Sequence, residues 1–191
     1  MRLPEVVVLS GADALAADVA GRVGTTLAHV LQQRQRAAVA LTAGSIMEQV
    51  WAALARPPAA DAVDWSRVDV FWGDERFVAH DSPDRNDAPA ERLLFGAEPF
   101  SAARRYSMPA SDGAHGDDLD AAAAAYARTL YDARRPDDSA DVPNFDVVLL
   151  GVGPDGHCCS LFPEHPGVYD DSAAVIPVRN SPKPPPSRLS L

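Results

Sequence analysis

The residues best suited to chemistry lie in a glycine-rich segment near position 150. Residues 151–157 read Gly-Val-Gly-Pro-Asp-Gly-His and follow the apolar run 145–150. Histidine can accept a proton near neutral pH, and Asp155 is close enough in sequence to orient the His157 ring or stabilise its charged form. His157 is therefore a candidate general base with Asp155 as its partner. Because Asp-x-His alone is a weak signal, a loop histidine bonded only to backbone remains the alternative.

The same segment also matches the dinucleotide-binding pattern G-x-G-x-x-G. That pattern requires an acidic residue at the end of the next strand, about 20 positions further on. Asp170 and Asp171 lie near that distance but precede the next expected strand, residues 173–178. We therefore interpret the glycines as positions where the backbone approaches a small ligand.

Two other segments could bind an anion. Residues 42–45, Thr-Ala-Gly-Ser, lie between an expected strand and an expected helix, where backbone N–H groups and the Ser45 hydroxyl can face a phosphate. The alternative is that Thr42 or Ser45 serves only as a helix N-cap. Residues 74–76, Asp-Glu-Arg, follow another expected strand, and Arg76 offers forked donors suited to phosphate. An ordinary surface ion pair would use the same residues.

Two cations stand near the C-terminus of the chain. Lys183 and Arg188 flank three consecutive prolines, residues 184–186. A proline-stiffened segment could hold both cations towards one ligand. Taken alone, the segment is more typical of a polyproline linker or an SH3-type ligand exposed to solvent.

The elements that would position these residues alternate between strands and helices. Apolar periodicity predicts strands at 5–10, 37–41, 68–72, 145–150 and 173–178, and helices at 12–35, 46–55, 88–94 and 117–134. This alternation predicts an α/β fold with a mostly parallel sheet and helices on both faces. In such sheets ligands bind beyond the carboxyl ends of the strands, where the segments after residues 41, 72 and 150 would lie.

Composition restricts the class of protein. The 191 residues predict one domain, 1–191, and the net charge of -10 argues against nucleic acid or anionic membranes as bulk partners. No apolar stretch approaches the roughly 18 to 20 residues that span a bilayer, and no secretion signal is visible, so we expect a cytoplasmic protein. The adjacent Cys158 and Cys159 could form a disulfide only with strained backbone geometry, so they cannot cross-link distant parts of the fold. The sequence contains no CxxC pair that would support a structural zinc site.

Four separated blocks together resemble the 6-phosphogluconolactonases of the glucosamine-6-phosphate isomerase/6-phosphogluconolactonase family. The blocks are residues 41–45 (LTAGS), 72–78 (WGDERFV), 149–163 (LLGVGPDGHCCSLFP) and 180–188 (NSPKPPPSR). The resemblance implies a three-layer, Rossmann-like sandwich similar to glucosamine-6-phosphate deaminase and ribose-5-phosphate isomerase. It also implies hydrolysis of 6-phospho-D-glucono-1,5-lactone to 6-phospho-D-gluconate in the oxidative branch of the pentose phosphate pathway. We expect a monomer that binds a small sugar phosphate and uses no metal or organic cofactor.

Carried over residue by residue, the resemblance makes His157 the base that activates water and Asp155 its partner. The substrate- and phosphate-binding residues that it implies are Gly44, Ser45, Asp74, Arg76, Lys183 and Arg188. A lactone is an activated ester, so a positioned water, a base and charge stabilisation suffice. The sequence has no G-x-S-x-G elbow, which argues against an acyl-enzyme on serine.

The chain departs from the family pattern at several positions. Ala43 stands where glycine is usual, residues 158–159 replace Thr-Ala, and Arg85 stands before Asn86 where serine is usual. The role of the loop around Arg85 is therefore open. Family members continue beyond residue 191, so the resemblance implies that the last elements of the domain are missing. We expect exposed apolar faces of the sheet and a tendency to aggregate.

Two other functions are compatible with this fold. A glucosamine-6-phosphate deaminase or isomerase would share the fold, but the segment after His157 does not match the deaminase Asn-Glu-Pro continuation. A non-catalytic sugar-phosphate-binding domain of a regulator would carry a helix-turn-helix, and the acidic N-terminal segment offers none.

Overall fold

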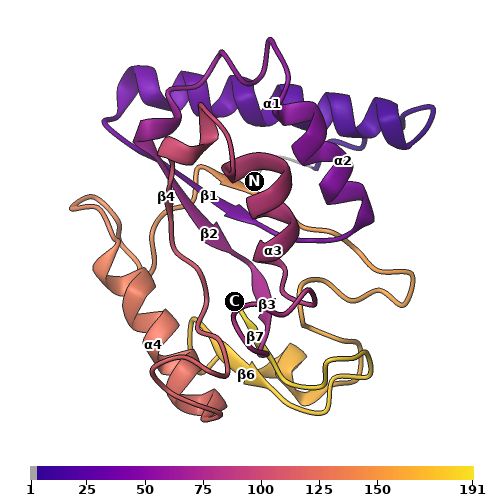
Figure 1. Cartoon of the computed structure of the whole chain (residues 1–191), viewed down its shortest axis with the longest axis vertical. Coiled ribbons are helices and arrows are strands. Elements are labelled where there is room, and N and C mark those ends of the chain that lie inside the picture. Colours follow the sequence, from indigo (N-terminus) through magenta and orange to yellow (C-terminus); the bar gives the residue numbers. More distant parts are fainter. Residues whose placement is uncertain (1–3) are drawn as a thin grey trace.

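The main sheet has four parallel strands. The computed structural model describes residues 4–191 (Figure 1). The strand order is β4-β2-β1-β5, with β1 Ala37–Leu41, β2 Val68–Trp72, β4 Arg104–Arg105 and β5 Val147–Val148. The predicted strands 37–41 and 68–72 are confirmed with their bounds. Every residue of β1 is buried, as expected for a parallel strand covered on both faces.

Helices cover both faces of this sheet. In Figure 1, α1 Ala12–Gln33 and α2 Ser45–Leu54 lie on one side, and α4 Leu119–Asp132 lies on the other. The fold is thus the predicted three-layer α/β sandwich. A short α3, Asp87–Ala90, continues into a π-helical turn, Glu91–Phe95. Three 3₁₀ turns complete the helical segments: Trp65–Arg67, Phe100–Ala102 and Pro166–Tyr169.

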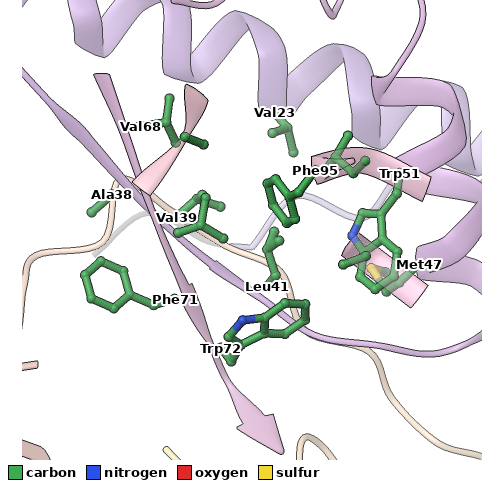
Figure 2. Close-up of a cluster of buried hydrophobic side chains, with 14 of the residues drawn as sticks. Val23, Ala38, Val39, Leu41, Met47, Trp51, Val68, Phe71, Trp72 and Phe95 are labelled. Atoms are coloured by element: carbon green, nitrogen blue, oxygen red, sulfur yellow. The ribbon is translucent and has the colours of Figure 1, made fainter. Parts of the chain in front are cut away.

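The buried core extends over both faces of the sheet, with Tyr126 and Leu130 of α4 on one face and the α1–α2 layer on the other. Figure 2 shows Val23 of α1, Trp51 of α2 and Leu41 of β1 in one cluster of buried side chains. The rings of Trp51 and Trp72 meet edge to face, with centroids 6.3 Å apart. Leu41 and Trp72 are the last residues of their strands, so this packing supports the carboxyl end of the sheet.

A second, antiparallel sheet lies beside this end. It contains β3 Asp74–Arg76, β7 Arg188–Ser190 and β6 Ile176–Val178, in the order β3-β7-β6. The prediction of a solvent-exposed linker for the proline block is wrong, because the strand that follows the block is buried and pairs with β3. The segment 74–76 is extended because β7 pairs with it, and the prolines connect β6 to β7. This pairing places Arg76 directly opposite Arg188.

Two other strand predictions are wrong. Residues 5–10 form no strand, and Val6 and Val8 are 83% and 88% exposed, because this run gains no ladder partner among residues 4–191. Residues 145–150 were expected to be a fully buried strand, but only Val147–Val148 pair. This strand is the edge of the sheet in the described chain, so Leu150 stays 55% exposed. No helix of residues 4–191 combines the length and apolarity needed to cross a membrane.

Candidate active site

A cavity of about 290 Å³ opens at the carboxyl ends of the parallel strands, next to β3. Six of the predicted site residues line it: Gly44, Ser45, Asp74, Arg76, His157 and Arg188. The other two, Asp155 and Lys183, contact His157. Four segments that are far apart in the sequence therefore meet at one place, and it is the edge of the sheet where ligands were expected.

His157 and Asp155 form a close pair. Nδ1 of His157 lies 2.6 Å from Oδ1 of Asp155, and Nζ of Lys183 lies 2.9 Å from the same oxygen. Hydrogen bonds from His157 and then Lys183 hold the pKa of Asp155 well below its usual range, so this carboxylate is ionised. An ionised carboxylate only accepts hydrogen bonds, which places the imidazole proton on Nδ1. Nε2 is then left with the lone pair that a general base needs.

A tight turn holds this pair in place. The N–H of Gly153 donates to the carbonyl of His157 at 2.9 Å, and the N–H of Gly156 donates to the carbonyl of Gly153 at 2.9 Å. Gly156 has φ 86°, a left-handed conformation that favours glycine. The His157 ring stacks on Phe162 with centroids 4.9 Å apart. No helix begins directly after Gly156: the next helical segment of the described chain is the 3₁₀ turn Pro166–Tyr169, so the segment lacks the helix that a dinucleotide-binding turn opens.

The opposite wall of the cavity is the beginning of α2. Its cap position is Gly44, with φ 133°, and no side chain of residues 4–191 caps the helix. The alternative that Thr42 or Ser45 serves only as the N-cap is therefore wrong. First-turn N–H groups have no intrahelical acceptor and carry partial positive charge. Together with the Ser45 hydroxyl they form a wall suited to an anion.

Asp74 is a buried carboxylate in the cavity wall. Its Oδ2 accepts a hydrogen bond from the Ser160 hydroxyl at 2.7 Å, and its Oδ1 accepts one from Nδ2 of Asn86 at 3.1 Å. Burial raises the pKa of Asp74, whereas Ser160 and the nearby cations Arg76 and Arg188 oppose that rise. Asn86, which lines the cavity, and Ser160 were missed by sequence reasoning. Their partner Asp74 is too distant in the sequence for any local pattern to indicate the contact.

Arg188 fastens the proline block to the site. Its Nε donates to the carbonyl of Pro185 at 3.1 Å, and its Nη2 donates to those of Lys183 and Pro184 at 3.2 and 3.0 Å. Burial, then the nearby charge of Arg76, lowers the pKa of Arg188. These bonds fix the backbone of Lys183, whose Nζ lies 3.1 Å from Nδ1 of His157.

Glu75 lies fully buried behind the wall that Asp74 and Arg76 form. Its carboxylate accepts backbone N–H bonds from Arg76, Asn86 and Asp87 at 2.7, 2.6 and 3.1 Å. Burial raises the pKa of Glu75 to about 7, although Arg85 pulls it down and Asp87 adds to the rise.

This shift predicts a pH-dependent stability. Because the folded pKa of about 7 exceeds the ordinary value of 4.5, the native state holds the proton more tightly than the unfolded chain does. The resulting stabilisation is complete below pH 4.5 and is lost as the pH rises through 7; at most it is roughly 3 kcal/mol. In urea titrations, the unfolding free energy of wild type minus that of Glu75→Gln should fall across this window. Parallel curves for the two proteins would contradict the assignment.

Comparison with known proteins places this site in a family context. The family model described as glucosamine-6-phosphate isomerases/6-phosphogluconolactonase matches residues 10–191. A 6-phosphogluconolactonase of Streptomyces coelicolor is 48% identical over 188 residues, which are 98% of this chain and 72% of that protein. The 6-phosphogluconolactonase of Mycobacterium leprae is 42% identical over 170 residues, 89% of this chain and 67% of that protein.

Solved structures agree in fold. The 6-phosphogluconolactonase of Trypanosoma brucei superposes with a TM-score of 0.81 at 27% identity, covering 99% of this chain and 76% of that one. A monomeric glucosamine-6-phosphate deaminase superposes with a TM-score of 0.70 at 16% identity, covering 98% of this chain and 76% of that one. The likeness to the deaminase concerns the fold alone.

Proposed function

This chain belongs to the glucosamine-6-phosphate isomerase/6-phosphogluconolactonase family, and we propose that it hydrolyses 6-phospho-D-glucono-1,5-lactone to 6-phospho-D-gluconate. The curated relatives at 48% and 42% identity are both 6-phosphogluconolactonases, whereas the deaminase neighbour is 16% identical. The observation that carries the proposal is the Asp155–His157 pair, which lies at a cavity lined by Arg76 and Arg188. A base beside cationic groups is what hydrolysis of an anionic lactone requires.

The proposed mechanism needs one water and no covalent intermediate. Nε2 of His157 takes a proton from the water, whose oxygen attacks the lactone carbonyl carbon and forms a tetrahedral oxyanion. Asp155 stabilises the resulting imidazolium through Nδ1. The oxyanion then collapses, the bond to the ring oxygen breaks, and that oxygen takes the proton back from His157. The carboxylic acid product loses its proton to solvent.

The cations have separate roles in this proposal. Lys183 lies on the Nδ1 side of His157, next to the cavity, and in this proposal its positive charge stabilises the oxyanion that develops on the substrate. Arg76 and the first turn of α2 line the cavity and would hold the phosphate. Arg188 has used its Nε and Nη2 donors on backbone carbonyls, so it acts mainly by holding Lys183 in place.

Lys183 offers a direct test because it is the only lysine in the chain. Lys183→Met should lower kcat by about 10²-fold, the loss typical of one oxyanion-stabilising donor. Lys183→Arg keeps the charge and should recover part of that rate. Steady-state rates for both variants decide the point, and a Met variant as fast as wild type would exclude the role.

The function itself is tested by substrate choice. Lactone hydrolysis is measured above its spontaneous rate, and in parallel the release of ammonia from glucosamine 6-phosphate is assayed. Hydrolysis without ammonia release supports a lactonase. The reverse result would favour the deaminase, and binding of 6-phosphogluconate without turnover of either compound would favour a sensor.

We also propose that the protein acts as a monomer in the cytoplasm. The free thiols of Cys158 and Cys159 suit a reducing compartment. Sedimentation of the purified chain tests the oligomeric state, and fractionation of the source cells tests the location.

A further inference from the structure

Arg85 is a charged side chain buried behind the cavity wall, with only 1% of its surface exposed. Its guanidinium makes a bidentate interaction with the Asp87 carboxylate, with Nε 2.9 Å from Oδ1 and Nη2 2.8 Å from Oδ2. Nη2 also donates to the carbonyl of Met108 at 2.9 Å and lies 3.5 Å from Oε2 of Glu75. Nη1 has no hydrogen-bond partner among residues 4–191.

This arrangement is a poor way to gain stability. Burying an ion pair is costly in desolvation, and apolar side chains of similar volume often stabilise a core as well or better. One guanidinium nitrogen of Arg85 even lacks a partner. The value of such a residue therefore lies in the geometry that its directional bonds impose on what surrounds it.

The two sequence neighbours of Arg85 hold the two charged side chains of this cavity wall. The carbonyl of Asp84 accepts a hydrogen bond from Nη1 of Arg76 at 3.0 Å. Nδ2 of Asn86 donates to the carbonyl of Asp74 at 2.9 Å and to its Oδ1 at 3.1 Å. A shift of this loop would therefore move Arg76 and Asp74 together.

We propose that Arg85 is a positioning residue that anchors the loop 84–87, so that Asp84 aims Arg76 and Asn86 holds Asp74 in the cavity. The anchor reaches three separate elements: Asp87 begins α3, Glu75 belongs to β3, and Met108 lies in the segment that follows β4. Arg85 also separates Glu75 from Asp87, two buried carboxylates that would otherwise repel each other and open the loop. This inference rests on the proposed function, in which Arg76 binds the substrate phosphate.

The test is a double-mutant cycle between Arg85 and Arg76. Arg85→Lys keeps the charge but cannot make two parallel hydrogen bonds to Asp87. The loop 84–87 should then shift and displace Arg76, which should lower kcat/KM for the lactone about tenfold or more. In the background of Arg76→Met the same change should cost less than about twofold, because the side chain that it positions is already gone. Equal losses in both backgrounds would show a general structural effect and would overturn the proposal.

Two further variants serve as a control and as a substitute in this experiment. Arg135→Lys alters another partly buried arginine that bonds carboxylates, Asp146 and Asp138, at the amino end of the sheet, and it should leave kcat/KM unchanged. If Arg85→Lys fails to fold, the double variant Arg85→Met with Asp87→Asn removes both charges of the bidentate pair, and the same cycle is run with it.

Binding of inorganic phosphate separates this inference from the proposed function. Arg85→Lys should weaken phosphate binding several-fold in calorimetry, whereas Arg135→Lys should not. A chain that binds phosphate in this pattern but does not hydrolyse the lactone would refute the function and leave the positioning role standing. A chain that hydrolyses the lactone with additive losses would refute only the positioning role, and one that does neither would refute both.

Discussion

Replacing His157 by alanine should lower kcat for lactone hydrolysis by about 10²- to 10⁴-fold, the usual contribution of a positioned general base. The variant removes the only imidazole at the cavity in the described chain and leaves Asp155 paired with Lys183. Folding should survive, because the His157 side chain is 21% exposed and its polar partners, Asp155 and Lys183, also pair with each other. Initial rates above spontaneous hydrolysis, with thermal melts on the same samples, measure both effects.

His29→Ala is the matched control for this variant. His29 lies on the exposed surface of α1, where it bonds Gln33, and it does not line the cavity. Its loss should leave kcat unchanged. A His157→Ala variant that retained half of the wild-type rate would show that another group activates the water.

The Asp155–His157 pair could be predicted because its geometry is local. Asp155 and His157 are two residues apart in a glycine-rich turn, so their contact follows from the chain itself. The strands 37–41 and 68–72 were equally predictable, because continuous apolar runs between polar ends are typical of buried parallel strands. These elements bring residues 42–45 and 74–76 to the site.

The other half of the site depends on pairing that no local pattern reveals. β3 and β7 lie far apart in the sequence, and their ladder brings Arg76 opposite Arg188, which follows the proline block and lines the cavity. Residues 145–150 have the composition of a buried strand, but exposure is decided by neighbouring elements, and this strand lies at an edge.

The burial of Arg85 could not be predicted from the local sequence either. The segment around it reads Asp-Ser-Pro-Asp-Arg-Asn-Asp, which is typical of a solvated loop. The structure buries Arg85 because two carboxylates, Glu75 and Asp87, and the carbonyl of Met108 meet there. A buried charge is explained by its partners, and those partners come from three different elements.

Replacing Gly153 by alanine should reduce activity almost as far as removing His157 itself. A Cβ at this position would overlap with Cε1 and Nδ1 of His157 and would lie 2.7 Å from Oδ1 of Asp155. The imidazole and the carboxylate stand where the new methyl group must go, so one of them has to leave and their hydrogen bond breaks. We expect a loss of about 10²-fold or more in kcat, since small displacements of reacting groups have effects of that size.

Two further variants test whether Gly153→Ala acts by displacing His157: one at the nearby Gly151, and one that combines Gly153→Ala with His157→Ala. At Gly151 an added Cβ meets no atom of residues 4–191 within 4 Å, so Gly151→Ala should lose far less rate than Gly153→Ala although the two positions lie in the same glycine-rich segment. Because the methyl group at position 153 acts through the imidazole, Gly153→Ala combined with His157→Ala should be no slower than His157→Ala alone. If the double variant were slower than His157→Ala while its thermal melt was unchanged, Gly153 would contribute to catalysis in some way other than by leaving space for the His157 ring.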